Sequence, residues 1–206
     1  MFPALLFASS RVPHAPEKVQ LTIATLHAAA LTTPRSAGDS TDAPFFVFEV
    51  IGPHASSASV LPESGQLRVH RDEAVGARPL TELTLAGGDS VQVLVSVLEN
   101  AKAQSRNTPA SASTRAISAS AQVDEATRLV APMIKDGAHL LGSVSMLVTN
   151  EGGAIYWRKL ECVATCTVLN APGTAALPAA AAVGGVVELS GNGGTYHLAL
   201  QANRAQ

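Results

Sequence analysis

The run VQVLVSVL, residues 91–98, decides the fold class, because its side chains alternate between two faces. One face carries four valines, and the other carries Gln92, Leu94, Ser96 and Leu98. Alternation with a period of two residues is typical of a β-strand that buries one face in a core. We therefore expect a core strand at this place in the chain.

The same alternation recurs in short runs along most of the chain. They centre on residues 19–23, 46–50, 67–69, 144–148, 155–157, 186–189 and 196–200. Many short strands separated by turns indicate a sandwich or a barrel. Turn residues at 150–153 and at Asn192-Gly193 predict hairpins, and so an antiparallel meander in the C-terminal third. The expected fold is a mostly β, antiparallel β-sandwich.

Three segments depart from this pattern. Residues 122–134 space Val123, Ala126, Val130 and Met133 as a helix does, and Pro132 with Asp136-Gly137 should end or kink it. Residues 101–121 and 170–182 are long tracts of small residues and proline, which predict loops. We expect an N-terminal arm at 1–18 and a single domain at 19–206 that contains the long loop at 101–121.

Charge and hydropathy exclude several classes of partner. The 14 basic and 16 acidic residues give a net charge of -2, which offers no footprint for nucleic acid. No apolar run reaches the ~18 to 20 residues that span a bilayer, so a soluble protein is expected. The first basic residue, Arg11, follows the apolar run at 2–8, whereas a secretory signal has its basic residue first. The expected location is the cytoplasm or an assembled particle, with secretion left open.

A family resemblance rests on three short matches. Asp42 is followed by Pro44 and Phe45, a later strand ends at Glu99, and Leu141-Gly142 begins another strand. In this order they resemble a C2 domain, so the sandwich is expected to be C2-like or jelly-roll-like. The resemblance implies a module that binds lipid or protein, with Asp39, Asp42 and Glu99 as residual calcium ligands. Because calcium takes six to eight oxygens, we predict weak or no calcium binding, with Asp42 in an Asx-type turn.

Other chemistry-bearing residues give no site. Cys162 and Cys166 lie four apart in a run that reads as one strand, which would hold them about 13 Å apart, so we expect two free, buried thiols.

No cofactor or metal is expected. The six histidines lie singly in the sequence, at His14, His27, His54, His70, His139 and His197. Trp157, in phase with Ile155, is expected in the core.

The favoured function is a non-catalytic structural subunit or interaction module that forms homo-oligomers. A folded surface of about 9,000 Å² would carry only one charge per roughly 300 Å², which favours association. The expected interface combines Phe2, Leu5, Leu6 and Phe7 of the arm with Phe45, Val47 and Ile51 of a strand that is apolar on both faces. A loop covering that strand's outer face is the alternative. The other classes left open are the C2-like binding module and an enzyme with a loop-built site.

Overall fold

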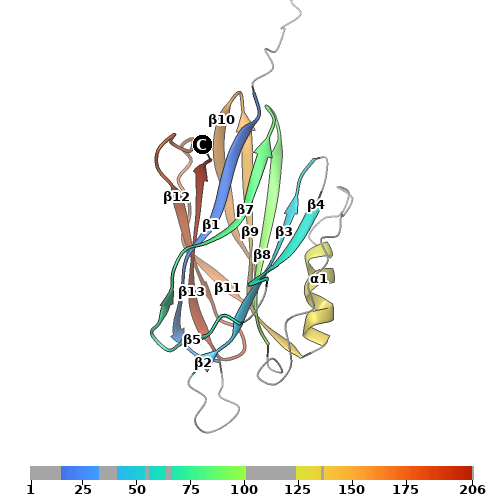
Figure 1. The fold of residues 1–206 in the computed structure, drawn as a ribbon, viewed down its shortest axis with the longest axis vertical. Coiled ribbons are helices and arrows are strands. Elements are labelled where there is room, and N and C mark those ends of the chain that lie inside the picture. The colour runs from blue at the N-terminus through green and yellow to red at the C-terminus, as the bar shows by residue number, and fades with distance from the viewer. Residues whose placement is uncertain are drawn as a thin grey trace, which may run out of the picture.

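Two antiparallel sheets face each other, which confirms the mostly β fold class. The computed structural model describes residues 15–32, 41–53, 56–63, 66–100, 124–135 and 137–205. We call the two layers the front sheet and the back sheet, as they lie in Figure 1. The front sheet has the order β11, β12, β13, β1, with the short β6 and the longer β7 both paired to β1. The back sheet has the order β10, β9, β8, β3, β4.

The bounds of the elements are as follows. The front sheet comprises β1 (Glu17–Ala30), β6 (Ala74–Val75), β7 (Arg78–Leu85), β11 (Cys166–Asn170), β12 (Val183–Leu189) and β13 (Thr195–Arg204). The back sheet comprises β3 (Pro44–Ile51), β4 (Ser56–Leu61), β8 (Ser90–Asn100), β9 (Ala138–Glu151) and β10 (Ala154–Ala164). A small separate pair joins β2 (Thr41–Asp42) to β5 (Val69–His70), and α1 spans Asp124–Lys135.

The main core lies between the sheets and is built from one face of each. The valine face of β8 points into it, and Val93, Val95 and Val97 have no exposed surface. Trp157 is 1% exposed in the same core, as predicted, and its Nε1 donates a hydrogen bond to the carbonyl oxygen of Lys159. The period-two pattern therefore identified the strand faces that pack between the layers.

A second, smaller core lies on the outer side of the back sheet, under α1. Figure 1 shows α1 beside β3 and β4, outside the two layers. Phe45 and Val47 are each 5% exposed and belong to one cluster with Val130, and Met133 packs against that cluster. β3 is thus buried on both faces, as its sequence indicates, and a helix supplies part of the outer cover.

α1 begins two residues after its predicted start, and it includes Pro132, which was expected to end or kink it. α1 continues past Pro132 to Lys135. Gly137 lies just beyond this end; its φ is 97° and its N–H donates to the carbonyl oxygen of Ile134. Glycine adopts this left-handed conformation without steric cost. Among the described residues, no helix has the length and apolar character to cross a membrane.

The C-terminal strands are divided between the two sheets, which corrects the single predicted meander. β9 and β10 form a hairpin in the back sheet, whereas β11, β12 and β13 form a meander in the front sheet. The predicted turn between β12 and β13 is present, with positive φ at Asn192 (54°) and Gly193 (76°). Those angles suit the tight hairpin turn that Asn-Gly sequences form.

The prediction of two free thiols is wrong, because the chain turns sharply where it passes from one sheet to the other. Thr165, between β10 and β11, has a φ of 47°, so residues 162–166 do not form one extended strand. The Cα atoms of Cys162 and Cys166 are 5.5 Å apart, and the two residues form a disulfide. The bond links the end of β10 in the back sheet to the start of β11 in the front sheet.

Candidate functional site

Asp42, one of the three acids that the resemblance implies as residual calcium ligands, is instead an acceptor in a buried hydrogen-bond cluster. Its carboxylate accepts 2.8 Å bonds from both the N–H and the hydroxyl of Thr32, and a further bond from the hydroxyl of Tyr196. These contacts replace the expected Asx-type turn. Because both carboxylate oxygens are engaged within the chain, Asp42 is placed to hold β2 against β13 and against Thr32, which follows β1.

Glu99 lies in the same region of the molecule. It is 7% exposed, it stands opposite Pro44 in the pairing of β8 with β3, and it accepts a 3.3 Å bond from the side-chain amide of Asn192. Burial, the bond to Asp42 and the charges of Asp42 and Glu99 together raise the pKa of Tyr196 far above its ordinary value. The structure therefore brings Asp42 and Glu99 near one phenol, while Asp39 lies outside the described residues.

This cluster does not amount to a metal centre. Across the described part of the chain, no group of three or more His, Cys, Asp or Glu side chains is arranged to hold a metal ion. The cluster can clamp strands that are distant in sequence, since a buried carboxylate with several donors favours a single arrangement of its neighbours.

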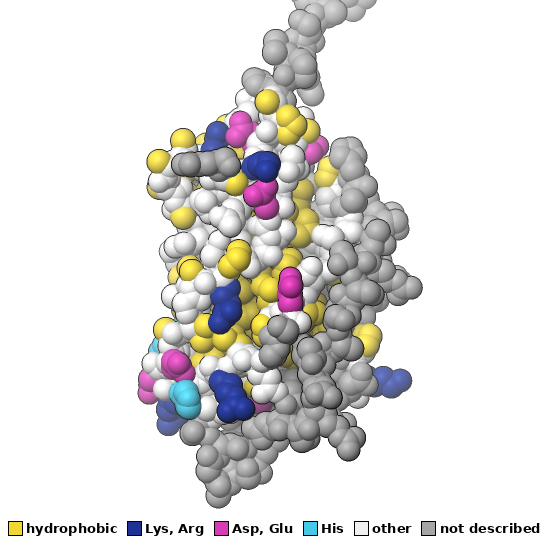
Figure 2. Space-filling view, viewed as in Figure 1, with side chains coloured by type: hydrophobic (Ala, Val, Ile, Leu, Met, Phe, Trp, Pro, Cys, Tyr) yellow, Lys and Arg dark blue, Asp and Glu magenta, His cyan; other side chains and the backbone are white. Residues whose placement is uncertain are grey.

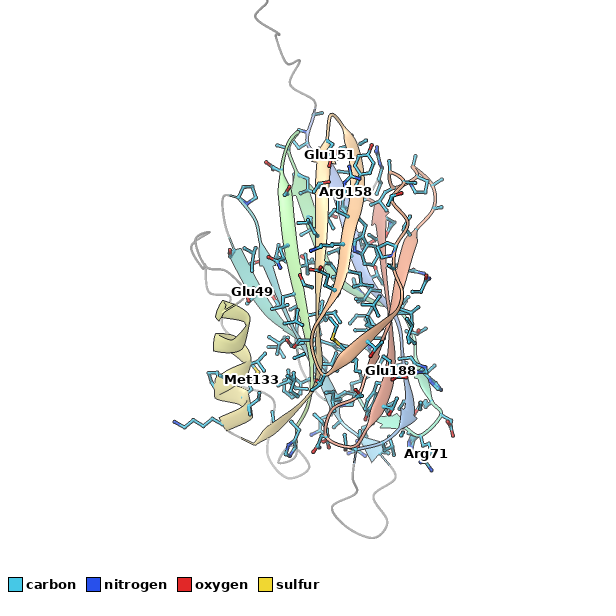
Figure 3. All side chains as sticks on the ribbon, turned by 180° about the vertical axis from the view of Figure 1, so that it is seen from behind. Glu49, Arg71, Met133, Glu151, Arg158 and Glu188 are labelled. Atoms are coloured by element: carbon cyan, nitrogen blue, oxygen red, sulfur yellow. A yellow bond between two sulfur atoms is a disulfide. The ribbon has the colours of Figure 1, made fainter. Side chains whose placement is uncertain are left out.

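The strand residues expected at an interface occupy different environments. Phe45 and Val47 pack in the cluster beneath α1, so the chain itself covers them. Ile51 is half-buried at the end of β3, opposite Ser56 of β4. The four arm residues Phe2, Leu5, Leu6 and Phe7 lie outside the described residues. Figure 3 shows α1 against the β3 side of the back sheet, with Met133 labelled on it.

A surface that the sequence analysis did not single out lies where β10 passes into β11. Val163 is 40% exposed and Leu169 is 54% exposed, and the large exposed apolar side chains of the described residues are these two and Ile134. β11 is an edge strand, paired with β12 alone among the described strands. We call the surface formed by Val163, β11 and the loop at residues 171–182 the uncharged side.

The name follows from the sequence, because residues 162–187 contain no Asp, Glu, Lys or Arg. The loop in this range is ordered against β10. Leu177 is 3% exposed in the main core, its N–H donates a 2.7 Å bond to the carbonyl oxygen of Ile155, and Ala176 forms a bridge with Tyr156. A tract predicted only as a long loop thus closes one edge of the sandwich and presents alanines to solvent.

Charged side chains lie mainly towards the two ends of the outer surface of the front sheet (Figure 2). Figure 2 shows the middle of this face as largely white and yellow, with Lys and Arg beside Asp and Glu near its upper end and at its lower left. A shallow groove of about 530 Å³ lies here between β1, β7, β13 and residues 179–182. Its charged members are already paired, Glu82 with Lys18 at 2.8 Å and Arg204 with Glu17 at 3.4 Å.

The same face carries a row of polar side chains that the sequence alone did not bring together. His27 stands opposite His197 in the pairing of β1 with β13, and His197 stands opposite Glu188 in the pairing of β13 with β12. In the sequence, these histidines show themselves only as polar residues that alternate with apolar ones along a strand. His27 and His197 each lie between buried residues of a strand, so both must point outward, but only the strand register shows that they are neighbours.

Searches of protein-family models, curated proteins and solved structures find no match to this chain.

Proposed function

We propose that this chain is a non-catalytic β-sandwich interaction module that associates with copies of itself through the uncharged side. One observation supports this most strongly: Val163 and Leu169 are exposed at a sheet edge with no charged residue between positions 162 and 187. Natural edge strands often carry charges that prevent pairing with other chains. β11 carries none, although its pairing with β12 is irregular between Val168 and Asn170. An edge without charged side chains favours association.

A second copy fits this edge for a geometric reason. β11 has backbone N–H and C=O groups on the side away from β12 that pair with no described strand. The same edge of another copy, related by a twofold axis, offers the complementary groups and the same apolar side chains. Antiparallel pairing of two β11 strands would join two front sheets and bury Leu169 of each copy.

The disulfide bears on where such a module works. Disulfides persist in oxidising environments and are rare in the reducing cytosol. Cys162 and Cys166 are paired beside the proposed interface. This favours a secreted, surface or particle-associated protein over a cytosolic one, and the bond would fix the corner from which β11 starts.

Substitutions on the uncharged side test the proposal. Leu169→Lys places a charge on the edge strand, and Val163→Lys places one beside the disulfide. We expect the dissociation constant of the assembly, measured by light scattering against concentration, to rise at least about tenfold in each. Ile134→Lys is the matched control, because Ile134 is 44% exposed but lies on α1. Equal effects of all three substitutions, or none, would refute this interface.

A second candidate is the C2-like module that binds lipid or protein with weak or no calcium dependence. It is favoured by the proximity of Asp42 and Glu99 to Tyr196 near β2 and the end of β8, the positions that the resemblance implies. Co-sedimentation with vesicles of phosphatidylserine and phosphatidylcholine, with and without calcium, tests it. Binding that is lost in Asp42→Asn but retained in Leu169→Lys would favour this function over self-association.

A further inference from the structure

His27 and His197 form a pair whose ring separation is compatible with a shared metal ion. The two ring centroids are 5.8 Å apart and the ring planes differ by 31°. Both side chains are partly exposed on the outer face of the front sheet, since their strand neighbours Leu26, Ala28, Tyr196 and Leu198 point into the core. Two imidazoles that bind one ion through nitrogens at about 2.0 to 2.1 Å have centroids roughly 5 to 6 Å apart. The separation of the two rings therefore fits a shared ion.

The surroundings leave room for an ion. On the side of β1 away from β13, the residue opposite His27 is Ala74 of β6. The next pair along the same face of β1 and β13 is Thr25 with Ala199. These side chains are small and uncharged, so they neither cover the two rings nor repel a cation.

Glu188 is placed to orient the ring of His197. Its Oε2 lies 3.3 Å from Nε2 of His197. An ionised carboxylate can only accept, so the neutral imidazole must carry its proton on Nε2, which leaves Nδ1 with a free lone pair. Histidines that bind metals commonly donate their other ring N–H to a carboxylate in this way.

We propose that His27 and His197 bind one divalent transition-metal ion on the outer face of the front sheet, with Glu188 as a positioning residue for His197. Imidazole nitrogens suit zinc and copper, and water molecules would complete the coordination of the ion. The site is independent of the proposed self-association, because both of its ligands come from one chain.

Calorimetric titration of the full chain with zinc chloride tests the site. We expect saturable binding of about one ion per chain, weakened at least tenfold in His27→Gln and in His197→Gln. His70→Gln and His139→Gln are the matched controls, because both histidines are exposed and neither stands opposite another histidine. Glu188→Gln should weaken binding less than either ligand variant, since it replaces the orienting carboxylate by a neutral, weaker acceptor and leaves both ligands in place.

Electron paramagnetic resonance with copper distinguishes ligands from structural effects. The spectrum of the copper-loaded chain should show coupling to two imidazole nitrogens, and each ligand variant should show one. Absence of saturable zinc binding would overturn the proposal, as would zinc binding that His27→Gln and His197→Gln leave unchanged. Equal losses in the His70→Gln control would also overturn it, because they would show adventitious binding by surface histidines.

Discussion

The hydroxyl group of Tyr196 donates a hydrogen bond to the carboxylate of Asp42, a residue 154 positions earlier in the chain. Tyr196 has no exposed surface and Asp42 is 5% exposed. The bond joins the start of β13 to the end of β2, and Thr32 donates to the same carboxylate. Asp42 therefore serves the structure of this end of the sandwich.

Tyr196→Phe should destabilise the protein by about 2 kcal/mol, because it removes one donor from a buried carboxylate while keeping the ring in the core. Urea denaturation measures the difference. Tyr156→Phe is the control, since Tyr156 is only partly buried and its ring lies under Arg158, with 3.8 Å from the guanidinium carbon to the ring centroid. A Tyr196→Phe variant as stable as this control would show that the bond to Asp42 contributes nothing.

The raised pKa of Tyr196 predicts how stability depends on alkaline pH. Its folded-state pKa lies above the ordinary value of 10.0, chiefly because of burial and then because of Asp42. The protonated phenol is the form that the fold stabilises, so this contribution is complete below pH 10 and is lost as the pH rises further. In Tyr156→Phe, where Tyr196 is the remaining tyrosine, tyrosinate absorbance should appear only as the protein unfolds. Titration before unfolding would contradict this.

Arg158 should control the titration of Glu151. Its guanidinium bonds both carboxylate oxygens, at 3.0 and 2.6 Å, and this contact is the main cause that lowers the pKa of Glu151. Figure 3 shows the two residues side by side at the end of the β9–β10 hairpin. In Arg158→Ala, the pKa of Glu151 measured by NMR should rise towards 4.5, its value without such contacts. An unchanged titration would mean that the pair does not persist in solution.

The disulfide should contribute about 2 kcal/mol to stability, a modest amount because it closes a short loop of sequence separation 4. Cys162→Ser/Cys166→Ser should lower the free energy of unfolding by that amount without changing the fold. A thiol assay of the unfolded, unreduced chain should find no free thiol. Two free thiols in that assay would restore the original sequence-based expectation.

Gly191→Ala should destabilise the protein by about 1 to 3 kcal/mol, because its Cβ would overlap the carbonyl oxygen of Leu140 and would lie 2.7 Å from Cα of Leu141. Backbone atoms cannot rotate away as a side chain can. Gly173→Ala is the matched control, since nothing lies within 4 Å of its Cβ position. Thermal denaturation of the two variants should separate them clearly, and equal midpoints would contradict the close packing of Gly191 on β9.

Sequence analysis predicted the strands best where one face of a strand carries all of its strongly apolar residues. β8 alternates valines with other residues, and every valine entered the main core. β7 was not predicted, because its proline and charged residues lower its strand character, although Leu80, Leu83 and Leu85 are buried. An edge strand tolerates such residues on its exposed side.

The candidate sites were less accessible to sequence analysis, because each depends on register or on a local turn. The distance between Cys162 and Cys166 followed from the assumption of an extended chain, and nothing in the threonine at position 165 signals a positive φ. His27 and His197 become neighbours only through the pairing of the first long strand with the last.

Sedimentation equilibrium of the full chain over a wide range of concentrations tests the central claim most directly. A monomer has a mass of 21.1 kDa. We predict a concentration-dependent mass that reaches at least twice this value, and a return towards 21.1 kDa in Leu169→Lys but not in Ile134→Lys. A mass of 21.1 kDa at every concentration would contradict the account.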